Sequence, residues 1–406
     1  MKNVVHLALL AALLGSSIGL AAAAQAVRPE VGQPLQEAQL LLQGKKYREA
    51  LDRIEKAARV AGLDAHERYL VERLRAAAAT GAGDYIGAVR AYEQALASTE
   101  LPDAERLHVL DAIGRLAYAG KQYGKAATAI QDYRTAGGDS VETLRLLPQA
   151  LYLADRHVEA ARELSAQIAA SEKAGKAPGE AQLQLLGSIA LKRGDDAGYR
   201  AALEKLVTHY PKDSYWQDLI ARTANQPGFS DRLALDLYRL RSRTGTLDKA
   251  GEYLEATQLA LQAGLPGEAK QFLDAGYRRG LLGTGAATDV DRHKRLSDLV
   301  AKRVAEDQQT FAEGETAAAA KASGDALVAT GLNYVGYGQF DRGIPLIEQG
   351  LAKGQLTQES VSRLHLGYAY LRAGKKQEAI RTFQSIQGSG GAADLSALWL
   401  VQVGST

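Results

Sequence analysis

Apolar and small residues recur at three- and four-residue steps through most of this chain, which is the spacing of one face of an α-helix. Residues 366–383 show the arrangement most clearly, because their helical spacing breaks at Ala373 and Gly374 and then resumes. We therefore predict two short amphipathic helices joined by a tight turn. Gly374 suits the end of the first helix, since glycine adopts a positive φ without strain.

Small residues mark the place where the two predicted helices cross. Gly367 and Ala379 have little or no side chain, so the two backbones can approach each other there. Tyr370 and Phe383 are large enough to fill the space beside the crossing. This stretch is thus expected to form a packed helical hairpin.

The same order of small, aromatic, turn and small positions recurs upstream. It is found around Gly331 and Gly343 and, with Tyr199 in the place of the second small residue, around Gly187. Near the start of the chain the second small position is occupied by alanines that are each 38 residues apart: Ala50, Ala88 and Ala126. A unit between residues 151 and 168 keeps the helical spacing, but Asp155 and His157 stand where Gly and an aromatic residue are expected.

These positions resemble the tetratricopeptide repeat family, whose unit of about 34 residues has small, aromatic, Gly, Ala and aromatic positions in this order. The resemblance implies an all-α fold, a solenoid of stacked helical hairpins wound into a right-handed superhelix. It also implies that the first helix of each hairpin lines a concave groove that binds a partner.

The first 26 residues have the three parts of a signal peptide: a basic start, an apolar run from Val4 to Leu14, and a small-residue end at Ala24-Gln25-Ala26. We expect cleavage after Ala26, export to the periplasm, and no membrane span afterwards. Secretion to the outside is the alternative destination, and an uncleaved membrane anchor is the alternative to cleavage.

The remaining chain is expected to fall into three parts. Residues 27–280 form an amino-terminal array, residues 281–323 an irregular linker or diverged repeat that is a candidate hinge, and residues 324–406 a carboxy-terminal pair of hairpins. The helix predicted over residues 392–403 then caps the exposed apolar face of the last hairpin.

Charge and cysteine content exclude several classes of function. The chain has 49 Lys and Arg against 47 Asp and Glu, a formal net charge of +2, which argues against a dedicated nucleic-acid binder. It has no cysteine, so disulfides, thiolate metal sites and a cysteine nucleophile are excluded. No two of its seven histidines have the i, i+4 spacing of a helical zinc site. We therefore expect no catalytic residues, no metal and no cofactor, and hence no enzyme.

Candidate binding residues follow from the implied groove. On the helix predicted over residues 105–118, polar and aromatic side chains lie on a different face from the apolar stripe. Matching positions occur on the second unit and on the last clear unit. The candidate groove residues are Arg73, His108, Asp111, Arg115, Tyr118, His365, Tyr368 and Arg372.

Three hypotheses about function remain open at this point. The first is a non-enzymatic scaffold of the bacterial cell envelope that binds a peptide or protein in the groove. The second is an envelope enzyme or a protein that binds a glycan or small molecule, with carboxylates of the irregular region in a cleft: Glu306, Asp307, Glu313 and Glu315. The third is a self-assembling structural protein, and the sequence does not fix the oligomeric state.

Overall fold

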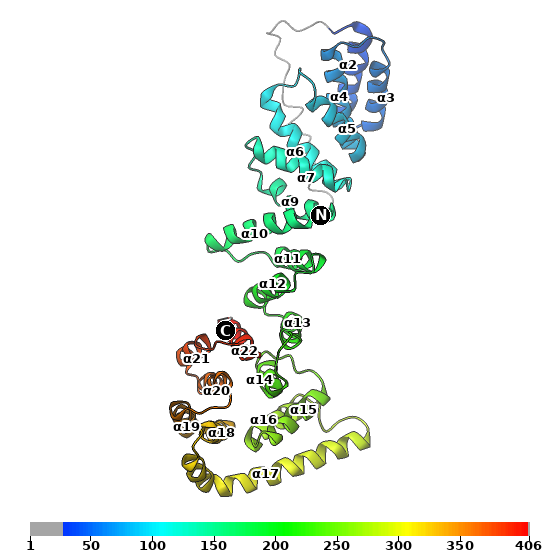
Figure 1. Cartoon of the computed structure of the whole chain (residues 1–406). Coiled ribbons are helices and arrows are strands. Elements are labelled where there is room, and N and C mark those ends of the chain that lie inside the picture. Colours follow the sequence, from blue (N-terminus) through cyan, green and yellow to red (C-terminus); the bar gives the residue numbers. More distant parts are fainter. Residues whose placement is uncertain (1–26, 405–406) are drawn as a thin grey trace. The chain divides into compact units, whose positions relative to one another are not determined.

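The computed structural model describes residues 27–404, so the predicted signal peptide, residues 1–26, lies outside the described residues. Every regular element between residues 27 and 404 is a helix, and this range contains no strand (Figure 1). The predicted all-α fold is thus confirmed. The chain forms two compact units: unit 1 comprises residues up to 176 together with 188–195, and unit 2 comprises residues 177–187 and those from 196 onward.

Unit 1 consists of helical hairpins in chain order, and its helices are α2 (Pro29–Gln43), α3 (Tyr47–Ala58), α4 (Ala65–Ala82), α5 (Tyr85–Leu96), α6 (Asp103–Ala119), α7 (Tyr123–Thr135), α8 (Val141–Leu144), α9 (Leu147–Leu153) and α10 (His157–Lys173). The helices α2 and α3, α4 and α5, α6 and α7, and α9 and α10 pack as pairs. Each pair also packs against the next, through α3 with α4, α5 with α6, and α7 with α9. The helix α11 (Glu180–Lys192) contributes residues to both units.

The predicted crossing residues lie where the hairpin helices meet. Ala50, Ala88 and Ala126 are all fully buried, at 0% exposure. The core around the first hairpin joins α2, α3 and α4 through Val31, Ile54 and other buried apolar side chains. Hairpins that cannot bury their apolar faces alone therefore stack to do so, as in other repeat proteins.

The weaker unit near residue 155 also forms a hairpin turn. Asp155 takes a positive φ of 58° between α9 and α10, at the place where Gly is expected. Asp is one of the few residues other than glycine that tolerate this conformation. The turn between α9 and α10 therefore forms with Asp155 in place of the expected glycine.

Unit 2 contains α12 (Asp196–His209), α13 (Asp213–Ala224), the 3-10 turn η1 (Asp231–Leu233), α14 (Ala234–Arg243), α15 (Ala250–Gln262), α16 (Pro266–Arg278), α17 (Ala287–Ala320), α18 (Asp325–Gly336), α19 (Phe340–Lys353), α20 (Glu359–Arg372), α21 (Lys376–Gln384) and α22 (Ala392–Gly404). Its clear hairpins are α15 with α16, α18 with α19, and α20 with α21.

Glycines at two crossings of unit 2 leave no room for a side chain. A Cβ atom on Gly367 would lie 2.4 Å from the ring of Phe383, and one on Gly331 would lie 2.5 Å from the carbonyl oxygen of Gly343. Gly374 ends α20 with a φ of 76°, as expected for the turn. The hairpin predicted over residues 366–383 is thereby confirmed in its details.

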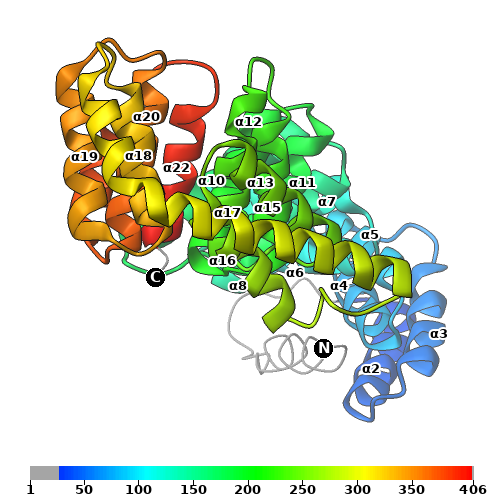
Figure 2. The same cartoon turned by 90° about the horizontal axis from the view of Figure 1, so that it is seen from below.

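The irregular region forms one long helix. α17 covers 34 residues and continues through most of the alanine-rich stretch that begins at Ala317. It packs against α15, α16 and α18 (Figure 2). Residues 281–323 thus lie inside unit 2 and are packed on both neighbouring hairpins, and their role as a hinge and the boundaries at 280 and 323 stay predictions.

Unit 2 closes on itself, which the sequence does not predict. α22 covers the last hairpin through α20 and α21, as expected of a cap, but it also packs against α12, α13 and α14. At the same junction the backbone N–H of Ser230 donates a hydrogen bond to the carbonyl oxygen of Gly390 at 3.2 Å. Unit 2 is therefore a closed circuit of packed helices rather than an open row.

Candidate functional site

The groove residues predicted in unit 1 lie on the first helices of two hairpins. Arg73 of α4 pairs with Glu105 of α6, with 3.5 Å between Nη2 and Oε1. The hydroxyl of Tyr69, also on α4, donates to the other oxygen of Glu105 at 3.4 Å. Arg73 therefore links consecutive repeats, and part of its donor capacity is used within the protein.

Asp111 on α6 is also engaged within unit 1. It accepts a hydrogen bond from the hydroxyl of Thr143 on α8, and Nη1 of Arg115 lies 3.7 Å from its Oδ2. Arg73 and Asp111 thus belong to a row of polar contacts along the first helices.

Three predicted side chains of α6 remain accessible. His108 is exposed, while Arg115 and Tyr118 are half-buried. The Tyr118 ring packs edge-on against Tyr123 with 5.6 Å between centroids, and burial raises the pKa of its hydroxyl. The opposite face of α6 is buried in the core through Leu110 and Ala117. Arg115 and Tyr118 are thus held by neighbouring side chains and are partly exposed, and their role in binding stays a prediction.

The groove residues predicted in unit 2 surround a buried ion pair. Arg239 of α14 donates to Glu268 of α16 through Nε at 2.8 Å and through Nη2 at 2.6 Å. Its Nη1 donates to Asp236 at 2.7 Å. Arg239, Asp236 and Glu268 are each 3% exposed or less.

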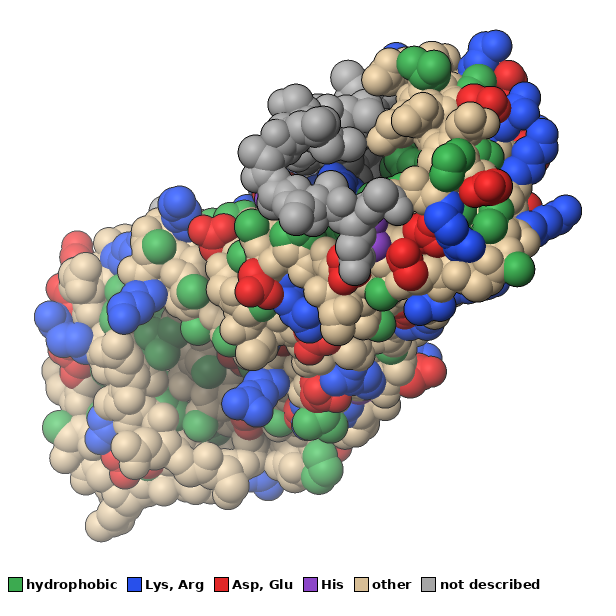
Figure 3. Space-filling view, turned by 90° about the horizontal axis from the view of Figure 1, so that it is seen from above, with side chains coloured by type: hydrophobic (Ala, Val, Ile, Leu, Met, Phe, Trp, Pro, Cys, Tyr) green, Lys and Arg blue, Asp and Glu red, His purple; other side chains and the backbone are tan. Residues whose placement is uncertain are grey.

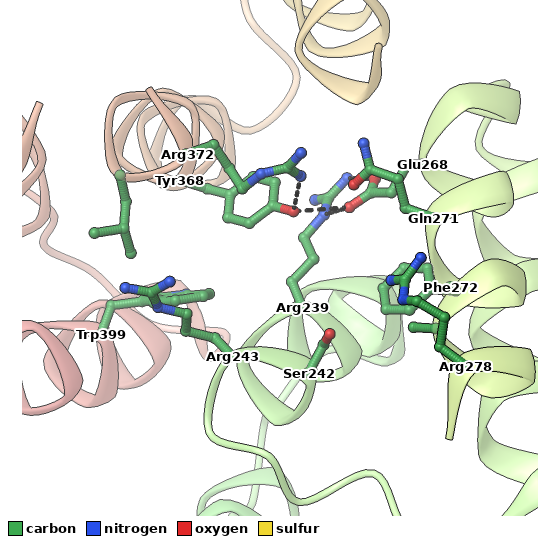
Figure 4. A pocket seen from close by; sticks show the side chains of 12 residues that line it. Arg239, Ser242, Arg243, Glu268, Gln271, Phe272, Arg278, Tyr368, Arg372 and Trp399 are labelled. Carbon is green, nitrogen blue, oxygen red and sulfur yellow. Dashed lines mark hydrogen bonds and ion pairs between the residues drawn. The ribbon is translucent and has the colours of Figure 1, made fainter. Parts of the chain in front are cut away.

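The predicted residues of α20 complete this network. His365 Nε2 lies 3.3 Å from Oδ1 of Asp236. The hydroxyl of Tyr368 donates to Glu268 at 3.2 Å and accepts from Nη1 of Arg372 at 2.8 Å. The buried network, which we define as Asp236, Arg239, Glu268, His365, Tyr368 and Arg372, therefore ties α14, α16 and α20 together (Figure 4).

The pKa shifts in the buried network follow from its charges. Burial alone would raise the pKa of Asp236, but His365 and Arg239 lower it to about 2. Burial alone would lower the pKa of Arg239, but Glu268 and Asp236 raise it above its ordinary value. Burial and the Glu268 carboxylate raise the pKa of Tyr368 to about 12. Opposite charges in a poorly solvated site thus hold the ionised forms of Asp236 and Arg239.

A cavity of about 450 Å³ adjoins the buried network. Its lining comes from α14, α16, α20 and α22 (Figure 4). Four arginines contribute to it, Arg239, Arg243, Arg278 and Arg372, but only one carboxylate, that of Glu268. Aromatic and aliphatic side chains form the rest of the wall, among them Phe272, Leu371 and Trp399.

Sequence reasoning found one side of this site and missed the other. It named His365, Tyr368 and Arg372 but not Asp236, Arg239 or Glu268, and two of these three, Asp236 and Arg239, lie in α14, whose sequence lacks the repeat signature. The one local signal is that Asp236 and Arg239 stand three residues apart, the spacing at which opposite charges pair on a helix. Tyr368 is 8% exposed, so it supports the wall of the cavity more than it offers a free surface.

Two of the four carboxylates proposed for an enzyme or ligand-binding cleft, Asp307 and Glu315, instead make structural contacts within unit 2. Asp307 accepts hydrogen bonds from Asn333 at 2.8 Å and from Tyr337 at 2.9 Å. Glu315 accepts from Tyr334 at 3.1 Å and pairs with Arg342 at 2.9 Å. Glu306 pairs with its own helix neighbour Arg303, and Glu313 is exposed. The four carboxylates are thus occupied or solvated singly and do not face one another as an acid–base pair does.

Residues 27–404 hold neither a cluster of metal-ligating side chains nor a helix that could span a membrane. Within the described part of the chain, no three His, Cys, Asp or Glu side chains gather as a metal ion would need. None of the helices between residues 27 and 404 is at once long and apolar enough to span a bilayer. On the face seen in Figure 3, basic and acidic side chains are interspersed rather than gathered by sign.

The stacked hairpins and their small crossing residues define the class of protein: between residues 27 and 404 it is an all-α protein built of stacked helical hairpins. No protein-family model matches the chain, and no curated protein matches it.

Among the solved structures that resemble the chain are three that share 11–14% sequence identity with it. A chain of the Naa15/Naa10 structure bound to HypK-THB has a TM-score of 0.30 at 14% identity, over 91% of this chain and 59% of that one. Yeast Tom70 has a TM-score of 0.24 at 11% identity, over 92% of this chain and 94% of Tom70. The P58(IPK) TPR domain has a TM-score of 0.24 at 12% identity, over 91% of this chain and 98% of that domain. The class of this chain follows from its own stacked hairpins.

Proposed function

We propose that the protein is a non-enzymatic scaffold of the bacterial cell envelope that binds a peptide or protein segment on the first helices of unit 1. The observation that carries the proposal is the division of α6 into two faces. Leu110 and Ala117 are buried, whereas Arg115 and Tyr118 are fixed by neighbours and half-exposed. Arg and Tyr are among the residues that most often anchor a protein partner.

Immobilised side chains favour binding because little rotamer entropy remains to be lost. Arg115 is held beside Asp111, and Tyr118 is held against Tyr123. The cost of ordering a free, rotamer-rich side chain at an interface is about 0.5–1.5 kcal/mol. A face whose anchors are already ordered avoids much of that cost.

Export to the periplasm with cleavage after Ala26 is part of the proposal. Val27 and Arg28, the first residues after the predicted cleavage site, are already built into unit 1. Val27 packs against the core of the first hairpin, and Arg28 pairs with the buried carboxylate of Glu67 at 2.6 Å. Cleavage after Ala26 therefore leaves these contacts intact. The mass of the protein recovered from the periplasm tests it, since Val27 is the expected first residue.

Affinity purification from envelope extracts tests the binding face. A partner retained by the wild type is expected to be lost when Arg115 and Tyr118 are both changed to Ala. The matched control is Arg90→Ala, which removes an exposed arginine from the second helix α5. Retention that is the same in all three proteins would refute the assignment of the face. Recovery of only a second copy of the chain would favour the self-assembling protein instead.

A further inference from the structure

We propose that the cavity of unit 2 binds a small organic anion, in which a carboxylate or phosphate group is attached to an apolar or aromatic body. This site is separate from the protein-binding face proposed for unit 1. It would make the protein a receptor for a small molecule as well as a scaffold.

The charges of the cavity favour an anion. Glu268 is the only carboxylate in the lining, and both of its oxygens already accept hydrogen bonds from Arg239. Asp236 takes a further donor of the same guanidinium. Arg239 is thus engaged by two carboxylates, and the positive charge left for a ligand comes from Arg243, Arg278 and Arg372.

These three arginines have no carboxylate partner among residues 27–404. Arg372 donates to the neutral hydroxyl of Tyr368, and no ion pair involves Arg243 or Arg278. A guanidinium carries five N–H donors in a planar fork that matches carboxylate and phosphate oxygens. Most of these donors are free to hold a ligand.

Arg372 is positioned before any ligand arrives. Its guanidinium lies 5.6 Å from the centroid of the Tyr368 ring and 6.0 Å from that of Phe340, and Nη1 is hydrogen-bonded to Tyr368. Tyr368 is in turn held by Glu268, which is fixed by Arg239. Hydrogen bonds from Arg239 to Glu268, from Tyr368 to Glu268 and from Arg372 to Tyr368 therefore fix the orientation of Arg372 (Figure 4).

The rest of the wall fits an apolar body. Phe272 and Trp399 are buried residues whose side chains reach the cavity, and Leu371 lies beside Arg372 on α20. Trp399 is stabilised by stacking on Phe383, with 6.0 Å between centroids and 4° between the ring planes. The lining thus combines cationic and aromatic parts, as sites for small organic anions require.

The volume favours a small molecule over a long segment of a partner protein. Pockets for small ligands usually measure about 300–1,000 Å³, and this cavity, at about 450 Å³, lies in the lower half of that range. Side chains from four helices of the closed circuit form its wall. α22, the helix that closes the circuit, contributes Trp399 to the wall.

Calorimetric titration of the full mature protein tests the proposal with four probes. Benzoate and phenyl phosphate carry an anion on an aromatic ring, benzyl alcohol carries the ring without the charge, and inorganic phosphate carries the charge without the ring. We expect saturable binding of benzoate or phenyl phosphate, with the stronger of the two identifying the anionic group. Benzyl alcohol and inorganic phosphate should bind at least about tenfold more weakly, because each lacks one of the two kinds of contact.

Variants locate the binding in the cavity. Arg372→Met and Arg243→Met should each weaken the better probe by about tenfold, the effect of losing a charge-assisted hydrogen bond. Arg363→Met is the matched control on α20, since Arg363 pairs with Glu359 at 2.6 Å on the exposed side of that helix. Circular dichroism and tryptophan fluorescence verify that each variant is folded.

Several results would overturn the proposal. One is the absence of binding by both aromatic anions at millimolar concentration. Another is binding that Arg372→Met and Arg243→Met leave unchanged. Equal affinity for inorganic phosphate would show a general anion effect. None of these results bears on the face of unit 1, so the proposed scaffold function is tested separately.

Discussion

Nη2 of Arg239 lies 2.6 Å from Oε2 of Glu268, and the two side chains are only 1% and 4% exposed. The pair joins α14 to α16, and Asp236 and Tyr368 extend it to α20. A buried ion pair gains from attraction in a poorly solvated site but also costs desolvation of both charges. Removing one partner leaves the other charge buried without compensation, so the pair is a sensitive place to test the fold of unit 2.

Arg239→Met should destabilise unit 2 by about 3–5 kcal/mol, because it strands the carboxylates of Asp236 and Glu268. Urea unfolding followed by tryptophan fluorescence measures this directly, since both tryptophans of the chain, Trp216 and Trp399, lie in unit 2. The control Arg363→Met breaks an exposed pair and should change stability by about 1 kcal/mol or less. A loss as small as the control's would mean that Arg239 is not the centre of the network.

Gly367→Ala tests the crossing of α20 and α21. The added Cβ would meet the Phe383 ring at 2.4 Å, and Phe383 is 1% exposed and has little room to move. We expect a loss of about 1–3 kcal/mol in the same urea experiment, the usual cost of overpacking. Gly251→Ala is the control, because no atom lies within 4 Å of a Cβ there. That change should be neutral or stabilising by up to about 1 kcal/mol, and an equal loss in both variants would contradict the account.

The stability of unit 1 should depend on Glu67 and on pH. Hydrogen bonding to Arg28 lowers the pKa of the buried Glu67 carboxyl to about 2, from an ordinary value of 4.5. Because the folded-state pKa is depressed, the stabilisation is complete above the ordinary value and is lost as the pH falls from about 4.5 towards 2. Glu67→Gln should therefore weaken unit 1 at about pH 7 and make little difference near pH 2.

Hydrogen exchange of peptides from α2 and α4, corrected for intrinsic rates, measures that difference. The wild type should lose protection from exchange on acidification. The Glu67→Gln variant should be less protected than the wild type at about pH 7 and should lose less protection as the pH falls. Glu49→Gln is the control, because Glu49 forms an exposed pair with Lys46 at 3.6 Å. The prediction would be wrong if wild type and Glu67→Gln lost protection in parallel.

Asp307→Ala should loosen α17 from the hairpin that follows it. Asp307 accepts hydrogen bonds from Asn333 and Tyr337 of the next hairpin, and burial together with its carboxylate raises the pKa of the Tyr337 hydroxyl. Hydrogen exchange is expected to accelerate in the carboxy-terminal half of α17 and to stay unchanged in unit 1. Glu313→Ala changes an exposed residue of the same helix and should have no effect. Equal exchange rates in the two variants would show that Asp307 does not hold α17 against the next hairpin. Rapid exchange of α17 already in the wild type would support the prediction that residues 281–323 act as a hinge.

The repeat hairpins were predictable from sequence because their signal is local. Small residues recur at a fixed interval in the first three units, at Ala50, Ala88 and Ala126. A close crossing of two helices needs a small residue, so the same position is small in successive units. The accessible face of α6 was predictable for the same reason, since helical periodicity separates Arg115 and Tyr118 from the core positions.

The closed form of unit 2 and its cavity were not predictable in this way. Asp236 and His365 are 129 residues apart and meet only within the circuit that α22 closes against α12, α13 and α14. The closure cannot be inferred from the spacing of residues within a repeat, because it depends on the angles between all successive hairpins of unit 2. Arg239 shows the difference: its spacing from Asp236 is visible in the sequence, but only the fold shows that both side chains are buried and that Glu268 also pairs with Arg239.

Site-specific photo-crosslinking in the native host tests the scaffold account most directly. A benzophenone amino acid at His108 stands on the proposed binding face, and the exposed position of His108 lets it be replaced without disturbing the core. We predict a discrete crosslinked polypeptide at His108 that is absent when the same probe replaces Arg90 on α5. No polypeptide at His108, or the same one at both positions, would contradict the account.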